Sequence, residues 1–387
     1  MKRFLCLMIV FLLVCFCSNN VCADDSLGLA APSSLLMDAS SGKVLYEHNS
    51  KEKRPCASIT KVMTMCLTFE AIEDGRLNED DVVTISPHAA AQPGSDIWLV
   101  EGEQMTVRDL LKSVAVVSAN DASVALAEAV SGTESAFVAE MNSKAKLLGM
   151  NDTVFKNCTG LDEDGHLTTA YDVALMSREL MRHEKVFGYV SIWLDYIRDG
   201  ATQLVNTNRL INSYSGIIGL KTGTTTLAGA CISAAAERDG SRIIAVVLGD
   251  KTTDERFNDA AKLLDYGFTS FGMTKPEIPE GIPKSINVKN GMRSSVQVAY
   301  EPNGEFLVKN EDMNNIEAEV HIADEATAPI QRGQRLGNVS YRLGGEMIGE
   351  FPITAVESVD EINFKDVFSL LFFKFLPREA PGGNTHT

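Results

Sequence analysis

A serine and a lysine three residues apart, Ser58 and Lys61, lie at the start of a segment whose pattern predicts a helix. Pro55 favours an extended entry, and Gly75 lies where a C-terminal cap belongs. Residues three apart share a helix face, with Cβ atoms about 5–6 Å apart. A lysine in apolar surroundings can act as a neutral base and activate a neighbouring serine as a nucleophile. The same pattern occurs by chance on many solvated helices, so the rest of the chain must supply its partners.

The predicted helix is apolar around most of its circumference, which is typical of a buried helix. Its N-terminus adds a partial positive charge and free N–H groups near the serine. Cys56 is a second possible nucleophile, but no His lies at a recognisable position, so we interpret it as a small buried hydrophobe. The apolar positions are Ile59, Val62, Met63, Cys66, Leu67, Phe69 and Ile72.

Two further polar motifs follow along the chain. Ser118 and Asn120 lie at a junction between two predicted helices, the first capped by Thr106 and the second ending before Gly132. Side chains at a junction can face a cleft, and the alternative is that either residue only caps the second helix. The third motif, residues 221–224, lies at the end of a predicted strand and consists of Lys221, Thr222, Gly223 and Thr224.

The order of elements predicts an α+β domain with an antiparallel sheet. Alternating runs flanked by turn residues predict strands, and three- to four-residue periodicity predicts helices. The predicted strands are a hairpin at 33–47 and runs at 82–85, 97–100, 217–222, 228–237 and 241–249; the helices include 106–117, 136–148, 169–183 and 254–271.

The first residues predict an export signal. Lys2 and Arg3 precede an apolar run, residues 4–16, that is too short to span a membrane comfortably. The pattern ending at Ala23 predicts cleavage there, so residues 1–23 are interpreted as a signal peptide; an uncleaved anchor is the alternative. The mature protein is expected on the outer face of the cytoplasmic membrane or in the cell-wall space, periplasmic or extracellular.

The sequence pattern changes in the C-terminal part of the chain. A proline-containing linker, 274–284, precedes short alternating runs that predict an all-β domain at 285–358. Residues 360–378 are too short to span a bilayer and too apolar for water, which favours an amphipathic helix on a membrane surface; packing on the β domain is the alternative. Residues 379–387 are expected to form a disordered tail.

The composition narrows the classes of partner. The chain has 387 residues, of which 45% are hydrophobic, so wholesale disorder is excluded. A net charge of −17 argues against nucleic acid as a partner. The four cysteines beyond the signal have no paired spacing, so no metal site is expected, and disulfide pairing stays open; they are Cys56, Cys66, Cys158 and Cys231.

The three motifs, in this order and in these contexts, resemble those of the low-molecular-mass penicillin-binding proteins, the serine-type D-alanyl-D-alanine carboxypeptidases. The resemblance covers nearly the whole chain and includes the stretches at 118–122, 207–210 and 219–225. It implies that residues 24–273 form a β-lactamase-like penicilloyl-serine transferase domain.

The resemblance implies a role for each catalytic residue. Ser58 attacks the carbonyl of the terminal D-Ala-D-Ala bond of a peptidoglycan stem peptide, and neutral Lys61 takes its proton. Ser118 relays a proton to the departing D-alanine, and Asn120 holds the substrate amide and Lys61. Water then hydrolyses the acyl-enzyme without a cofactor.

The third motif is implied to bind substrate. Lys221 offers a positive charge to the terminal carboxylate, assisted by the hydroxyl of Thr222 or Thr224, with Gly223 between them. The backbone N–H groups of Ser58 and Thr224 are implied to form the oxyanion hole. β-Lactams are expected to acylate the same serine. Hydrolysis of the resulting acyl-enzyme is expected to be slower than hydrolysis of the acyl-enzyme formed from the peptide.

Three other readings stay open. A class A β-lactamase shares the motifs but needs a Glu-x-x-x-Asn loop, and no such segment is convincingly placed here. A D,D-endopeptidase is closer, although such enzymes usually lack the β domain. The third is a non-catalytic peptidoglycan-binding scaffold, against which the intact Ser58, Lys61 and Lys221 argue.

Overall fold

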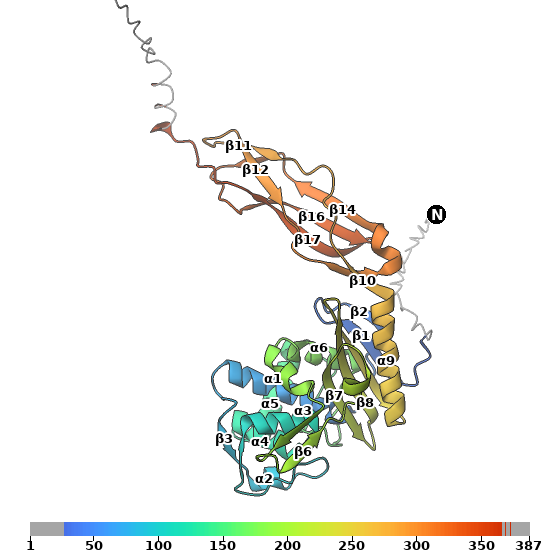
Figure 1. Cartoon of the computed structure of the whole chain (residues 1–387). Helices are drawn as coiled ribbons and strands as arrows, with labels where there is room; N and C mark the ends of the chain where they lie inside the picture. Colours follow the sequence, from blue (N-terminus) through green and yellow to red (C-terminus); the bar gives the residue numbers. More distant parts are fainter. Residues whose placement is uncertain (1–26, 366–367, 369–371, 373–387) are drawn as a thin grey trace, which may run out of the picture. The chain divides into compact units, whose positions relative to one another are not determined.

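The computed structural model describes residues 27–365, 368 and 372, and the chain forms two compact units, residues 1–269 and 270–387. The predicted signal peptide and the predicted tail both lie outside the described residues. Figure 1 shows a helix-rich first unit and a second unit made mainly of strands.

The first unit contains a five-stranded antiparallel sheet in the order β2-β1-β9-β8-β7. Its two faces follow the alternation of a strand. Leu35 and Met37 of β1 belong to the main core, whereas Leu36 faces Gly267 of the helix on the other side. The strands are β1 (Ser33–Asp38), β2 (Val44–His48), β7 (Ile217–Thr225), β8 (Gly229–Arg238) and β9 (Ser241–Asp250).

Helices gather on one face of this sheet, and α9 covers the other (Figure 1). Local caps fix several starts, since the hydroxyls of Thr106, Thr133 and Thr169 each accept a hydrogen bond from a backbone N–H three residues on. The helices are α1 (Lys61–Glu73), α2 (Pro87–Ala90), α3 (Val107–Val116), α4 (Asn120–Ser131), α5 (Glu134–Leu147), α6 (Ala170–Leu180), α7 (Phe187–Val190), α8 (Leu210–Ser213) and α9 (Thr253–Ser270).

The predicted buried helix is α1, and it is almost wholly buried. It is preceded by a turn of 3₁₀-helix, η2 (Ala57–Thr60), so Ser58 lies in this turn and Lys61 begins the α-helix. Gly75 follows the helix at φ +73°, as expected of a left-handed C-terminal cap.

The predicted strand at 97–100 is wrong. The alternating burial of Ile97 and Leu99 resembles a strand, but their N–H groups donate to the carboxylate of Asp121 rather than to a neighbouring strand. Strand β3 (Val82–Thr84) pairs instead with β4 (Gln104–Thr106).

A hairpin that the sequence did not predict also lies in this unit. Strand β5 (Leu194–Ile197) pairs with β6 (Thr202–Val205) around a turn that contains Gly200.

The second unit is an all-β domain, as predicted. A six-stranded sheet has the order β14-β16-β17-β12-β11-β15, and a separate pair joins β10 to β13. The strands are β10 (Phe271–Thr274), β11 (Ser285–Lys289), β12 (Ser295–Tyr300), β13 (Phe306–Lys309), β14 (Ile316–Ile322), β15 (Glu325–Thr327), β16 (Arg335–Leu343) and β17 (Glu346–Ala355), with a 3₁₀ turn, η4 (Asn310–Asn315).

The predicted amphipathic helix is described only in part. Phe364, Lys365, Phe368 and Phe372 are helical, and the three rings stack in succession. Among the residues that the structure describes, no helix combines the length and the apolar character needed to cross a membrane.

Candidate active site

Ser58 and Lys61 lie in contact at the start of the buried helix. Lys61 Nζ is 3.0 Å from Ser58 Oγ, and the lysine is fully buried while the serine is partly exposed. Two acceptors also hold the amine: Asn120 Oδ1 at 2.6 Å and the backbone carbonyl of Thr159 at 2.7 Å. The lysine therefore faces a hydroxyl, an amide oxygen and a peptide oxygen, none of which carries a charge.

Burial lowers the pKa of Lys61 to about 7, although Cys158, Asp121 and Cys56 oppose the shift. A neutral amine has two N–H donors and one lone pair. Asn120 and Thr159 accept two hydrogen bonds, so the third direction, toward Ser58, is left for the lone pair. In its neutral form the amine is thus arranged to accept a proton from the serine hydroxyl.

The second motif lies beside this pair. Ser118 adopts φ +66°, and its buried Oγ has no hydrogen-bond partner among the residues that the structure describes. Asn120 donates from Nδ2 to the carbonyl of Pro93, which fixes its amide with Oδ1 toward Lys61. The alternative in which these residues merely cap α4 does not hold, because no side chain caps the start of α4.

Two glycines allow the backbone to approach the serine closely. A Cβ on Gly223 of β7 would lie 2.8 Å from the backbone nitrogen of Ser58, and one on Gly160 would lie 1.9 Å from the carbonyl oxygen of Ala57. The strand and the 151–169 loop therefore pack directly against the turn that carries Ser58. Gly223, and with it the next strand residue, Thr224, therefore lies directly beside the backbone of Ser58.

Lys221 and Thr222 of the third motif are buried along β7. Lys221 donates to the carbonyl of Thr222 over 2.9 Å, and Thr222 donates to the hydroxyl of Thr207 over 2.7 Å. Burial, with Lys61 and Arg256 nearby, lowers the pKa of Lys221 well below its usual value. A carboxylate arriving at this lysine would reverse that shift, because an opposite charge favours the ammonium form.

The sequence did not single out Arg256, although it supports the third motif. It is buried on α9, and its Nη1 donates to the carbonyl of Gly223 and to the hydroxyl of Thr224, over 3.1 and 3.0 Å. No local pattern marks it, since its partners lie more than thirty residues earlier. Thr159 was also missed, because it acts through a backbone oxygen.

Cys56 does not compete as a nucleophile. Burial raises the pKa of its thiol to about 11, so it is protonated near neutral pH. It packs beside Thr60 as a small buried side chain, and all four cysteines beyond the predicted signal are free and buried.

Two protein-family models match the chain. The model for D-alanyl-D-alanine carboxypeptidase matches residues 20–252, and the model for the penicillin-binding protein 5 C-terminal domain matches residues 274–361.

Several relatives match nearly end to end. The chain is similar to D-alanyl-D-alanine carboxypeptidase DacF of Bacillus subtilis, with 40% identity over 94% of this chain and 96% of the relative. It is 35% identical to DacC of Escherichia coli over 88% and 87% of the two chains.

Among solved structures, penicillin-binding protein 5 from Haemophilus influenzae matches with a TM-score of 0.74 and 29% identity, over 86% of this chain and 98% of that one. Penicillin-binding protein D2 from Listeria monocytogenes, in its ampicillin-bound form, matches with a TM-score of 0.57 and 35% identity, over 62% and 98%.

Proposed function

The chain belongs to the D-alanyl-D-alanine carboxypeptidase family, and from this premise we propose that Ser58 is the nucleophile with which it removes the terminal D-alanine from peptidoglycan stem peptides. It is a serine-type D-alanyl-D-alanine carboxypeptidase and a penicillin-binding protein. The observation that carries the assignment of the serine is its 3.0 Å contact with a buried lysine whose other two partners are uncharged acceptors.

Acylation begins when neutral Lys61 takes the proton of Ser58. The serine oxygen bonds to the carbonyl carbon of the penultimate D-alanine, and the C–N bond to the terminal D-alanine breaks. The departing amine needs a proton, and Ser118, whose hydroxyl has no partner among the described residues, is suited to relay one from Lys61. Water then cleaves the ester and restores the serine.

The developing oxyanion is held by the backbone N–H groups of Ser58 and Thr224. Support comes from the close approach of β7 at Gly223, which leaves no room for a Cβ between the strand and Ser58. One such donor is worth about 2.7–4 kcal/mol of transition-state stabilisation. Arg256 is a positioning residue here, because it holds the carbonyl of Gly223 and the hydroxyl of Thr224.

Lys221 binds the terminal carboxylate of the substrate, with Thr222 and Thr224 beside it. Its single hydrogen bond given by the structure goes to the neighbouring backbone carbonyl, so its ammonium form gains a strong partner when a carboxylate arrives. Asn120 holds the substrate amide as well as Lys61. β-Lactams carry a carboxylate and a strained amide, which suits them to acylate Ser58 by the same steps.

The enzyme acts outside the cytoplasm, on the cell wall. Residues 1–23 serve as the export signal, and residues 360–378 attach the chain to the membrane surface. Support for the attachment comes from Phe364, Phe368 and Phe372, which follow one another at helical spacing and are exposed.

The decisive experiment compares the mature protein with Ser58→Ala on a pentapeptide precursor and on a fluorescent penicillin. Release of free D-alanine that disappears in the variant supports the proposal. Labelling by penicillin without release of D-alanine would favour a scaffold or another substrate. Rapid turnover of penicillin would favour a β-lactamase. Cleavage of cross-linked dimers alone would favour a D,D-endopeptidase.

A further inference from the structure

A thiol, a carboxylate and an imidazole gather at the C-terminal half of α1. Cys66 and Glu70 lie one turn apart on this helix, and His183 follows α6. The Cys66 sulfur, a Glu70 oxygen and a His183 ring nitrogen all lie within 4.8 Å of one another. None of the three takes part in the candidate active site, whose lysine begins the same helix.

The spacing of the two softer ligands is close to that of a metal site. Cys66 Sγ and His183 Nε2 are 3.9 Å apart. A tetrahedral zinc ion with bonds of about 2.3 Å to sulfur and about 2.0–2.1 Å to nitrogen separates those two atoms by about 3.5 Å. Bringing the sulfur and the nitrogen onto an ion therefore needs movements of a few tenths of an ångström, and the Glu70 oxygen, within 4.8 Å of both, can follow by rotation of its side chain.

A carboxylate on the far side of the imidazole prepares it as a ligand. Glu73 Oε1 lies 2.9 Å from His183 Nδ1, close enough for an ion pair but out of line for a hydrogen bond, and the histidine side chain is only 8% exposed. A carboxylate in this position favours a proton on Nδ1, so that the lone pair of Nε2 faces Cys66. The ring stacks on Phe69, which fixes its plane. Hydrogen-bonded carboxylate–histidine pairs commonly support zinc, and the Glu73 carboxylate needs only to reorient at this distance to form one.

The charges around the thiol favour a cation. Three carboxylates, Glu70, Glu73 and Glu179, face the thiol together with the single ammonium of Lys144. Burial, followed by the charge of Glu70, raises the pKa of the thiol. Lys144 bridges Glu179 and one oxygen of Glu70, so it keeps a partner when the carboxylate of Glu70 turns to a metal.

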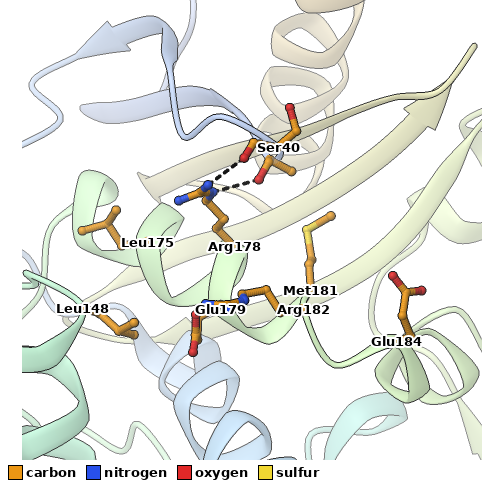
Figure 2. A pocket seen from close by; sticks show the side chains of 9 residues that line it. Ser40, Leu148, Leu175, Arg178, Glu179, Met181, Arg182 and Glu184 are labelled. Carbon is orange, nitrogen blue, oxygen red and sulfur yellow. Dashed lines mark hydrogen bonds and ion pairs between the residues drawn. The ribbon is translucent and has the colours of Figure 1, made fainter. Parts of the chain in front are cut away.

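Solvent reaches the neighbourhood of the cluster. A cavity of about 410 Å³ is lined by Leu148, Glu179 and Arg182, among others, and Figure 2 shows Glu179 and Arg182 at its wall. Arg178, at the same cavity, is engaged with the carbonyls of Ala39 and Ser40. The carboxylate that shares Lys144 with Glu70 thus borders an open space, and the side chain of Glu70 is itself 25% exposed, so an ion can reach this ligand from solvent.

We propose that Cys66, Glu70 and His183 bind a thiophilic divalent cation, with zinc the ion that suits a thiolate, an imidazole and a carboxylate. A sulfur–metal bond forms as the thiol proton passes to solvent, and water completes the coordination. The ion ties the end of α1 to the segment after α6 and stabilises the folded state. The cysteine spacing does not predict this site, because His183 lies 117 residues beyond Cys66.

Cadmium titration of the chelator-treated full chain tests the proposal. A cadmium–thiolate charge-transfer band is expected with one equivalent of metal, and zinc should displace the cadmium and raise the midpoint of thermal unfolding. The band should disappear in Cys66→Ser and persist in Cys231→Ser, a matched control whose buried sulfur faces the carbonyl of Ala228. Circular dichroism establishes that each variant is folded.

Glu73→Gln provides a second variant that leaves all three ligands intact. Its side chain is half exposed, so the substitution should not disturb folding. Loss of the supporting carboxylate is expected to weaken metal affinity about 10–100-fold. A missing band in the wild-type chain, a band that survives in folded Cys66→Ser, or unchanged affinity in Glu73→Gln would overturn the assignment. These readouts do not involve Ser58, so they stand apart from the proposed peptidase mechanism.

Discussion

Two buried lysines face opposite tasks within one site. In the proposed mechanism Lys61 must lose its proton to act as a base, whereas Lys221 must carry one to bind a carboxylate. Burial lowers the pKa of both, and the nearby charge of Lys61 lowers the pKa of Lys221 further. In the proposed mechanism the substrate resolves the conflict, because its carboxylate favours the charged form of Lys221 while burial keeps Lys61 neutral.

The pH dependence of acylation follows from the lysine pKa. With the pKa of Lys61 at about 7, the neutral fraction falls about tenfold for each pH unit below that value. The rate of labelling by fluorescent penicillin should therefore rise with pH and level off above about 7. Lys61→Arg, which stays charged, should abolish labelling at every pH. A rate that is constant from about pH 5 to 8 would contradict the role of Lys61 as the base.

Ser118→Ala should separate activity from stability. Its hydroxyl makes no hydrogen bond within the described part of the chain, and alanine keeps the Cβ, so unfolding free energy should change by less than about 0.5 kcal/mol. Release of D-alanine should fall about 10²–10⁴-fold if the hydroxyl relays the proton. Ser123→Ala is the matched control, since that hydroxyl donates to the carbonyl of Ala119 within α4. Full activity in folded Ser118→Ala would rule out the relay.

At the scale of elements, the site depends on three segments that meet at one turn. The 3₁₀ turn carries Ser58, β7 passes against its backbone at Gly223, and the loop at Gly160 closes the other side. Helix α9 supports the strand through Arg256. The contacts are backbone to backbone, so small changes in the strand displace the serine and the oxyanion donors together.

Gly223→Ala tests this close approach. The new Cβ would lie 2.8 Å from both the Ser58 nitrogen and the Cys56 oxygen, so the strand must shift. We expect destabilisation of about 1–3 kcal/mol and a loss of penicillin labelling larger than the loss of folded protein. Gly188→Ala in α7 is the control, because its Cβ would meet no atom within 4 Å and helical alanine is favoured over glycine. Normal labelling by Gly223→Ala would contradict the packing argument.

The elements that sequence predicts best are those with local signals. Threonine caps mark helix starts, and apolar residues around most of the circumference mark α1 as a buried helix. The strand expected at 97–100 failed because Asp121 takes the N–H groups of Ile97 and Leu99, a contact across more than twenty residues that no local pattern encodes. The sequence did not predict the roles of Arg256 and the Thr159 carbonyl, because their contacts also join residues that are far apart in the chain. Spacing predicted the pairing of Ser58 with Lys61, but only tertiary packing brings Asn120 to them.

At the scale of the whole molecule, the candidate active site and the proposed membrane attachment belong to different units. The first unit has its own large core and contains every residue of the candidate site. The second is built from strands with two smaller cores, one around Val296 and one around Tyr341, and it ends in the segment with the three stacked rings. We therefore expect hydrolysis and the proposed membrane attachment to be separable.

Removal of residues 360–387 should release the protein from lipid vesicles while D-alanine release in solution stays unchanged. Phe364, Phe368 and Phe372 are 85%, 58% and 55% exposed, and burial of one such side chain is worth about 1.5–3 kcal/mol. The double variant Phe364→Ser and Phe368→Ser should weaken co-sedimentation with vesicles, whereas Lys365→Gln, on the same helix, should weaken it less. If the helix packs on the β domain instead, truncation will lower the unfolding midpoint of the second unit and leave vesicle binding unaltered. Because both outcomes are measured on the same truncated chain, one preparation distinguishes an anchor from a packing element.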